Sequence, residues 1–146
     1  MNKILIMGLP GSGKTTLAKE LAYHFLVPYY NADTLREKHD DWDFTEEGRL
    51  RQAYRMSFYD FGIFDFVCPL KKMRDIVDAD YIIWMDTIKA GRFADTNKIF
   101  ESPQKYNLRI KTWIGQNQLL NSLEGFSPGT KGIQSYLKEQ FPRLVK

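Results

Sequence analysis

A glycine-rich segment near the start of the chain constrains the fold more than any other feature. Residues 8–15 read Gly-Leu-Pro-Gly-Ser-Gly-Lys-Thr and match the pattern G-x-x-x-x-G-K-S/T at every fixed position. The preceding residues 3–7 form a short apolar run, typical of a strand that is buried on both faces. Residues 15–25 carry apolar side chains at helical spacing. A strand, a glycine-rich turn and a helix in this order predict a phosphate-binding loop.

Each fixed residue of this loop has a physical role. The glycines let backbone N–H groups approach phosphate oxygens, and the start of the helix adds unpaired donors and a partial positive charge. Lys14 is expected to bridge the β- and γ-phosphates, and Thr15 to hold Mg²⁺ through its hydroxyl. An ordinary glycine turn beside a surface lysine is the alternative. We therefore expect ATP and Mg²⁺ as cofactors, at a phosphate site made of Gly8, Pro10, Gly11, Ser12, Gly13, Lys14, Thr15 and Thr16.

Strand-like and helix-like segments alternate along the rest of the chain. Apolar runs predict further strands at residues 29–30, 63–68, 80–86 and 108–113. Helices are expected after a cap at Asp33 or Thr34, over residues 45–60 with Thr45 as N-cap, from about Pro69, and over 130–141. Residues 87–107 and 115–129 have no clear pattern. This order predicts the α/β class, as a P-loop NTPase fold whose sheet has about five mostly parallel strands and helices on both faces.

Size and composition restrict the class of protein further. A chain of 146 residues is enough for one domain, so we expect 1–146 to be a single domain, with 114–146 as an extension or a helix packed on it. A formal charge of +3, scattered along the chain, suits an anionic small molecule and argues against nucleic acid. One cysteine, Cys68, excludes an internal disulfide. No apolar run approaches a membrane span or a signal peptide, so the expected location is cytoplasmic.

Missing motifs narrow the kind of nucleotide-binding protein. A GTPase would carry Asn-Lys-x-Asp after a late strand, and residues 97–100 lack the carboxylate. A motor ATPase would carry two acids after an apolar strand, but Asp86 is followed by Thr87. These absences favour a small-molecule kinase, which needs a phosphate cradle, an anion clamp for the acceptor and a carboxylate near the acceptor hydroxyl.

Polar residues after the second strand are candidates for the acceptor side. Asp33 lies where the carboxyl edge of a parallel sheet faces its ligand crevice, although a helix N-cap is an equal alternative. Arg36 and Arg49 have the planar guanidinium that suits phosphate and sulfate. For a single arginine the usual alternative is a solvated helix face, and we accept that alternative for Arg51.

Three segments together resemble the adenylylsulfate kinases. Residues 8–16, 31–36 and 43–49 are similar to the family's phosphate loop, its Asp-Gly-Asp-Asn-x-Arg segment and its Gly-Phe-Ser/Thr-Glu-x-x-Arg segment, in that order. Residues 67–74 and 93–103 are more weakly similar to later family motifs. The resemblance implies transfer of the ATP γ-phosphate to the 3′-hydroxyl of adenylylsulfate (APS), which gives 3′-phosphoadenylylsulfate.

The resemblance also implies roles for single residues. Asp33 would lie beside the acceptor hydroxyl, Arg36 and Arg49 would hold the phosphosulfate, and Phe44 would stack on the adenine. Three further positions are expected at the acceptor site by the same correspondence or by proximity, namely Gln52, Cys68 and Arg92.

Some residues depart from the family pattern. Asn31 replaces the first aspartate and Cys68 replaces a serine, although that site can act through its backbone. The family's basic lid helix after the fourth strand is missing. Residues 86–93 run across its position, where Lys89 and Arg92 are the cations near enough to replace it.

The leading hypothesis is therefore an APS kinase-like enzyme. A kinase of another nucleotide-like or small anionic acceptor, and an ATP-binding protein that has lost catalysis, are the alternatives. We expect a small-molecule partner, no nucleic acid and no membrane. Aromatic residues at positions 54, 58, 61, 64 and 66 predict either core packing or the surface of a homodimer.

Overall fold

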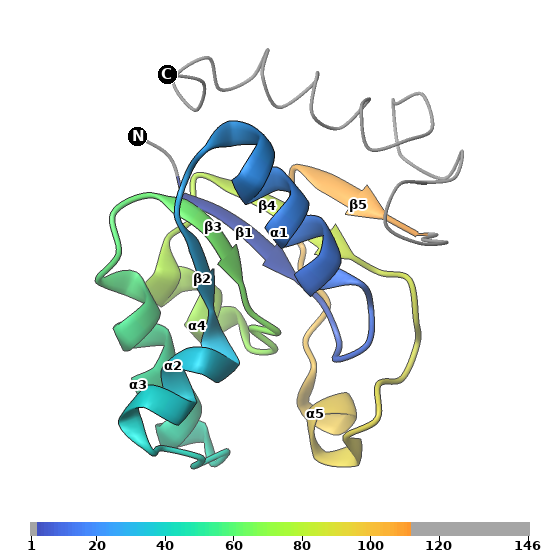
Figure 1. Ribbon diagram of the computed structural model, residues 1–146. Coiled ribbons are helices and arrows are strands. Elements are labelled where there is room, and N and C mark those ends of the chain that lie inside the picture. The colour runs from blue at the N-terminus through green and yellow to red at the C-terminus, as the bar shows by residue number, and fades with distance from the viewer. Residues whose placement is uncertain (1–2, 112–146) are drawn as a thin grey trace.

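Residues 3–111 are described by the computed structural model, in which strands and helices alternate (Figure 1). The strands are β1 (Lys3–Met7), β2 (Tyr29–Asn31), β3 (Gly62–Asp65), β4 (Tyr81–Met85) and β5 (Leu108–Ile110). The helices are α1 (Lys14–Phe25), α2 (Ala32–His39), α3 (Glu46–Ser57), α4 (Lys71–Val77) and α5 (Ala94–Ile99). The strands form one sheet in the order β2-β3-β1-β4-β5, and every neighbouring pair is parallel.

The sheet is buried on both faces because its central strands are apolar throughout. Ile4 and Ile6 of β1 pack with α1 on one face, whereas Leu5 and Met7 pack with residues of α2, α3 and α4 on the other. Figure 1 shows α1 on one side of the sheet and the α3 and α4 pair on the opposite side. The predicted five-stranded parallel sheet with helices on both faces is confirmed.

Several predicted boundaries differ from the observed ones. β3 begins at Gly62, which has a φ of +135° and lies too close to the carbonyl oxygen of Pro28 for a Cβ to fit. The same strand ends at Asp65, three residues earlier than predicted. α3 starts after the predicted cap Thr45 but ends at Ser57. The unpatterned stretch of residues 87–107 contains α5.

The cap of α2 was predicted at the wrong residue. Asn31 is the N-cap, and its Oδ1 accepts a hydrogen bond from the backbone N–H of Thr34 at 2.9 Å. Asp33 therefore lies in the first turn of α2, and its side chain is not needed as a cap. This finding removes the structural alternative that competed with a functional role for Asp33.

The aromatic residues divide between the core and the surface. Phe64 and Phe66 are buried beneath α3 and α4, while Tyr54 on α3 and Phe58 at its C-cap are exposed. Within residues 3–111 there is no helix with the length and apolar content to cross a membrane. The predicted segments at 112–113, 115–129 and 130–141, and the predicted extension 114–146, lie outside the described residues.

Candidate functional site

The phosphate loop joins β1 to α1, and its shape depends on glycine. A Cβ at Gly8 would lie 2.6 Å from the carbonyl oxygen of Met85, so only glycine lets the loop pass so close to β4. Gly13 begins α1 with a φ of 99°, and no side chain caps the helix. The first backbone N–H groups of α1 are therefore free of a capping side chain and available to an anion.

Lys14 lines the site together with two acidic residues, Asp33 and Asp65. Its side chain is buried, and burial lowers the pKa of its ammonium group. The nearby carboxylates of Asp65 and Asp33 oppose that shift, while Arg92 adds to it. Lys14 is thus within electrostatic reach of charged groups from α2, β3 and the segment after β4. A cation held in this way can follow negative charge as it develops on a transferred phosphoryl group.

Asp65, the last residue of β3, is a part of the site that the sequence pattern did not predict. Its side chain is buried, and one oxygen, Oδ2, accepts hydrogen bonds from Thr15 Oγ1 at 2.7 Å, Tyr29 OH at 2.7 Å and Asn31 Nδ2 at 2.9 Å. The available signal was a single acid inside an apolar run, but a strand predicted through Cys68 placed that acid in mid-strand. In the structure the strand ends at Asp65, beside the phosphate loop.

Thr15 and Asp65 together fit the requirements of Mg²⁺. A hydroxyl and a carboxylate are hard oxygen ligands, and Mg²⁺ is commonly held by one or two protein ligands together with phosphate oxygens. Among the described residues no group of three or more His, Cys, Asp or Glu side chains forms a cage for a metal ion. The donor set therefore suits a cation that arrives with a nucleotide, whose phosphate charge it would neutralise.

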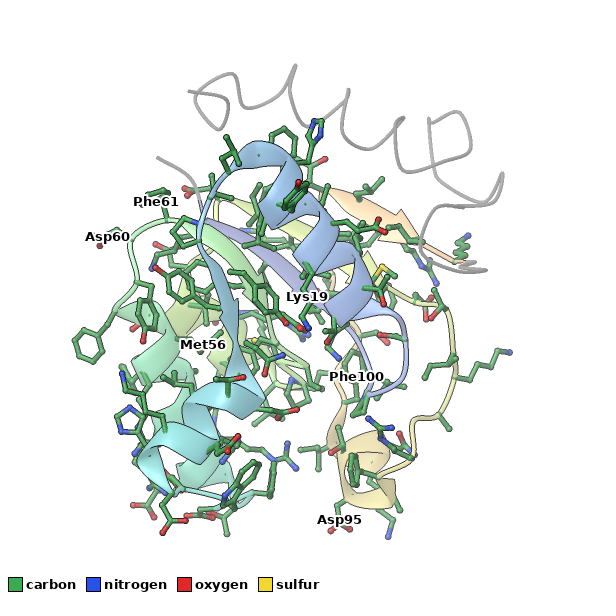
Figure 2. The ribbon with its side chains drawn as sticks, in the orientation of Figure 1. Lys19, Met56, Asp60, Phe61, Asp95 and Phe100 are labelled. Carbon is green, nitrogen blue, oxygen red and sulfur yellow. The ribbon has the colours of Figure 1, made fainter. Side chains whose placement is uncertain are left out.

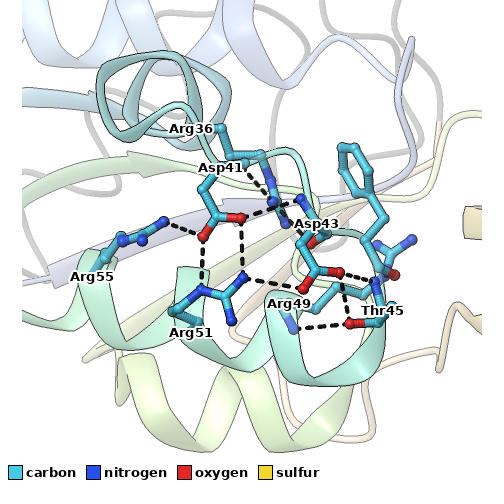
Figure 3. A network of polar contacts seen from close by, with 9 residues as sticks. Arg36, Asp41, Asp43, Thr45, Arg49, Arg51 and Arg55 are labelled. Carbon is cyan, nitrogen blue, oxygen red and sulfur yellow. Dashed lines mark hydrogen bonds and ion pairs between the residues drawn. The ribbon is translucent and has the colours of Figure 1, made fainter.

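A loop of residues 40–45 between α2 and α3 forms the opposite wall, and arginines fix it (Figure 3). Arg51 Nε and Arg55 Nη1 each lie 2.7 Å from Asp41 Oδ2, and Arg51 also bonds Asp43 at 3.1 Å. The hydrogen bonds from Arg51 hold the pKa of the Asp41 carboxyl well below its usual range. Arg36 Nη1 donates to the backbone carbonyls of Asp41 and Asp43. Arg51 lies on α3 outside the cavity lining with a side chain that is 39% exposed, as predicted for a solvated helix face, and it also anchors this loop.

The start of α3 closes tightly against the same loop. Thr45 Oγ1 accepts a hydrogen bond from the N–H of Gly48 at 3.2 Å, which confirms Thr45 as the N-cap. Asp43 Oδ1 accepts hydrogen bonds from the N–H and the hydroxyl of Thr45. A Cβ at Gly48 would lie 2.2 Å from the carbonyl oxygen of Asp43. Glycine is therefore required at this position of the helix.

Gly48→Ala is expected to destabilise the protein by about 1–3 kcal/mol, because the added methyl group overlaps backbone atoms of the loop. Helix propensity alone predicts the opposite sign, a gain of roughly 1 kcal/mol. Urea denaturation measures the difference, with Glu47→Ala, at the exposed neighbouring position of the same turn, as the control. A Gly48→Ala variant as stable as the wild type would show that the loop does not pack on α3 as described.

The fixed loop presents Phe44 to the cavity. The ring is 50% exposed, and the guanidinium carbons of Arg36 and Arg49 lie 4.3 and 5.3 Å from its centroid. Arg49 Nε also donates to the carbonyl oxygen of Phe44 at 2.8 Å. Burial lowers the pKa of both arginines, but guanidinium groups in proteins keep their charge. A planar aromatic surface and two cations therefore lie side by side on this wall.

Residues 86–93 form the third wall and run directly over the phosphate loop. Thr87 Oγ1 donates to the carbonyl oxygen of Ser12 at 2.7 Å. Gly91 lies against Pro10, and the side-chain amide of Asn97 bonds both the N–H and the carbonyl of Gly91. This segment leads into α5, which stands across from α2 and α3 (Figure 2). The segment after β4 therefore contacts the phosphate loop directly.

These walls enclose one cavity of about 630 Å³. Six of the eight predicted phosphate-site residues line it, while Gly8 and Ser12 lie outside its lining. The hydroxyl of Ser12 is buried and has no hydrogen-bond partner among the described residues. Of the predicted acceptor residues, five line the cavity: Asp33, Arg36, Phe44, Arg49 and Arg92. Lining residues that the sequence analysis did not assign to a site include Trp42, Asp65, Phe93 and Asp95.

Two predicted acceptor residues, Gln52 and Cys68, do not line the cavity. Gln52 is fully buried, and its Nε2 donates to the carbonyl oxygen of Ala32, which ties α3 to the start of α2. Cys68 is also fully buried, and burial raises the pKa of its thiol. Its carbonyl oxygen accepts a hydrogen bond from Arg74. Both residues therefore make structural contacts outside the cavity. Lys89 is exposed and lies outside the lining as well.

Comparison with known proteins finds likeness in structure only. No protein-family model and no curated protein sequence matches the chain. The APS kinase of Mycobacterium tuberculosis, solved with AMPPNP and APS, matches with a TM-score of 0.65 and 17% identity over 79% of this chain and 90% of that one. Shikimate kinase from Aquifex aeolicus matches with a TM-score of 0.61 and 16% identity, over 97% of this chain and 99% of that one. A gluconokinase from Sinorhizobium meliloti matches with a TM-score of 0.57 and 11% identity, over 79% of this chain and 85% of that one. The chain has the fold of the P-loop kinases.

Proposed function

We propose that this protein is an ATP-dependent small-molecule kinase that transfers the γ-phosphate to the 3′-hydroxyl of APS. The observation that supports this function best is that one cavity joins Lys14 of the phosphate loop to Asp33 on α2. A donor phosphate bound at the loop would therefore meet an acceptor hydroxyl bound beside the carboxylate. This juxtaposition also counts against a protein that binds ATP without catalysis.

The chemistry follows from the charges around the cavity. ATP would lie with its β- and γ-phosphates on the N–H groups of the loop and on Lys14. Asp33 would orient the acceptor hydroxyl and accept its proton as the oxygen attacks the γ-phosphorus. The ADP leaving oxygen would take up the charge, which Lys14 stabilises. Arg92, on the segment bonded to the loop, adds a second cation near this point.

The acceptor side suits a planar, anionic molecule. Phe44 and Phe93, which are 50% and 55% exposed, come from different walls of the same cavity. The guanidinium of Arg36 lies over the ring of Phe44. The guanidinium carbon of Arg92 lies 5.6 Å from the centroid of the Phe93 ring. Aromatic rings of this kind stack on nucleobases, and arginines bind phosphate and sulfate. An adenine with an attached phosphosulfate satisfies both features.

Phe44→Ala is expected to raise the KM for the acceptor by about 5–150-fold, the equivalent of roughly 1–3 kcal/mol of lost stacking. The KM for ATP should change little, because the ring lies on the acceptor wall. Steady-state kinetics with each substrate varied in turn measures both constants. Phe58→Ala, at an exposed aromatic outside the cavity lining, is the matched control. Equal effects on both substrates would argue against an acceptor role for Phe44.

A kinase of another small anionic acceptor is the second candidate. Asp95 lines the cavity and lies close enough to Arg49 to influence its pKa. The carboxylate of Asp95 can accept hydrogen bonds. It therefore favours an acceptor that offers hydroxyl or amino groups beside its anionic group. Shikimate kinase and gluconokinase, whose names describe such acceptors, share the fold.

An acceptor panel tests the proposal. Purified protein, ATP and Mg²⁺ are incubated with APS, shikimate, gluconate or a nucleoside, and ADP release and product mass are followed. We expect acceptor-dependent ADP with APS and a product heavier by one phosphate. Turnover with a different acceptor alone would replace APS by the second candidate. Binding of ATP without turnover on any acceptor would contradict a kinase that uses these substrates.

A further inference from the structure

The hydroxyl of Tyr29 makes a contact that the proposed chemistry does not use. It donates a hydrogen bond to Asp65 Oδ2 at 2.7 Å, the oxygen that Thr15 also bonds. Burial, followed by this hydrogen bond, raises the pKa of Tyr29, so the phenol stays protonated and remains a donor. The ring packs against the core beside α1, and Lys19 Nζ lies 5.9 Å from its centroid. Because the ring is packed against the core, the position of the hydroxyl is fixed.

Asn31 completes the arrangement from the same strand. Its Nδ2 donates to Asp65 Oδ2 at 2.9 Å and to Tyr29 OH at 3.1 Å, while its Oδ1 caps α2. The two donors of the amide and its acceptor are thus all engaged. One side chain links the carboxylate beside the phosphate loop to the helix that carries Asp33.

We propose that Tyr29, with Asn31, is a positioning residue that fixes the Asp65 carboxylate for the Mg²⁺ that accompanies ATP. The inference rests on the proposed function, because it assumes that Mg²⁺ and ATP bind at Thr15 and Asp65. Tyr29, Asn31 and Thr15 all use Oδ2, so none of them occupies Oδ1. Oδ1 would then be left to hold the cation or one of its waters.

The physical reason is the burial of Asp65. Asp65 is only 3% exposed, and a buried carboxylate needs hydrogen-bond donors to offset its lost hydration. Those donors also restrict its rotation. Loss of the Tyr29 hydroxyl removes one donor without removing the charge. The carboxylate then samples other orientations, and Mg²⁺ binds it less tightly.

The test measures how Mg²⁺ affects the binding of a non-hydrolysable ATP analogue, by calorimetry and without an acceptor. Tyr29→Phe is expected to need about 10-fold more Mg²⁺ for half-maximal enhancement, within the roughly 10–100-fold loss typical of changes to groups that support a metal ligand. Analogue binding without Mg²⁺ should stay unchanged. Tyr30→Phe is the matched control, because it is the same substitution on the same strand, where Tyr30 stacks on Tyr59.

A second variant guards against a folding defect. Asn31→Ser keeps a side chain suited to the N-cap and removes the donors to Asp65, so it should shift the Mg²⁺ dependence in the same direction. A Mg²⁺ dependence in Tyr29→Phe equal to that of the wild type, or an equal loss without Mg²⁺, would overturn the positioning role alone. A wild-type protein that binds no analogue, or that ignores Mg²⁺, would overturn both this inference and the proposed function.

Discussion

Replacing Lys14 with alanine is expected to lower kcat by at least about 10²–10³-fold. The Lys14 side chain is buried, within electrostatic reach of Asp65, Asp33 and Arg92. At such a buried position, water does not replace the lost positive charge. Its loss removes the cation that would follow the developing charge on the transferred phosphoryl group. It also leaves the two carboxylates facing the phosphates, which weakens the binding of ATP. We therefore expect Lys14 to contribute to both ATP binding and phosphoryl transfer.

The measurement is single-turnover kinetics at saturating ATP, with circular dichroism as a check on the fold. The fold should persist, because the shape of the loop depends on its glycines and on the Thr87 hydrogen bond to Ser12. Lys105→Ala removes an exposed lysine outside the cavity lining and serves as the control. Turnover of the Lys14→Ala variant within a few-fold of wild type would mean that the phosphate site lies elsewhere.

Replacing Asp33 with asparagine is the second large expected effect, a loss of about 10²–10⁴-fold in kcat. The amide has nearly the same shape and can still accept a hydrogen bond, but it cannot take the proton of the acceptor hydroxyl. The affinity for ATP should change much less, because Asp33 comes from α2 and in the proposed function contacts the acceptor. A fall in kcat with a nearly constant ATP affinity is the signature of a proton acceptor.

Asp40→Asn provides a matched comparison for this variant. Asp40 is the C-cap of α2 and has a φ of 49°, a conformation that asparagine adopts readily. Both substitutions remove one negative charge from the same helix, but Asp40 does not line the cavity. Equal activity losses in the two variants would point to an effect of net charge. An active Asp33→Asn variant would remove Asp33 from the reaction.

The sequence predicted the sheet and the phosphate loop because both depend on local patterns. A buried apolar run, the spacing of glycines and an amphipathic helix are each encoded in a few consecutive residues. The cap at Thr45 also followed from a short motif, whereas the grouping of Arg36, Arg49 and Phe44, which line one cavity, came from the resemblance to the adenylylsulfate kinases. These features need no knowledge of distant contacts.

The parts that the sequence did not predict depend on contacts between distant residues. Asp65 becomes part of the site because β3 pairs with β1 and ends beside Thr15, fifty positions away in the sequence. Arg51 is an anchor because the loop returns to α3 and places Asp41 beside it. Gln52 bonds the backbone of Ala32, so its distance from the cavity follows from how α2 packs on α3. Spacing along the chain cannot supply any of these contacts.

In the proposed reaction, a γ-phosphate at Lys14 passes to a hydroxyl beside Asp33 in the same cavity. The most direct measurement mixes excess protein and Mg²⁺ with APS and ATP labelled in its γ-phosphate, then locates the label in the products. Our account predicts label on the 3′-hydroxyl of APS, formed by the wild type and lost in both Lys14→Ala and Asp33→Asn. Label that remains in ATP, or appears only as free phosphate, would contradict it.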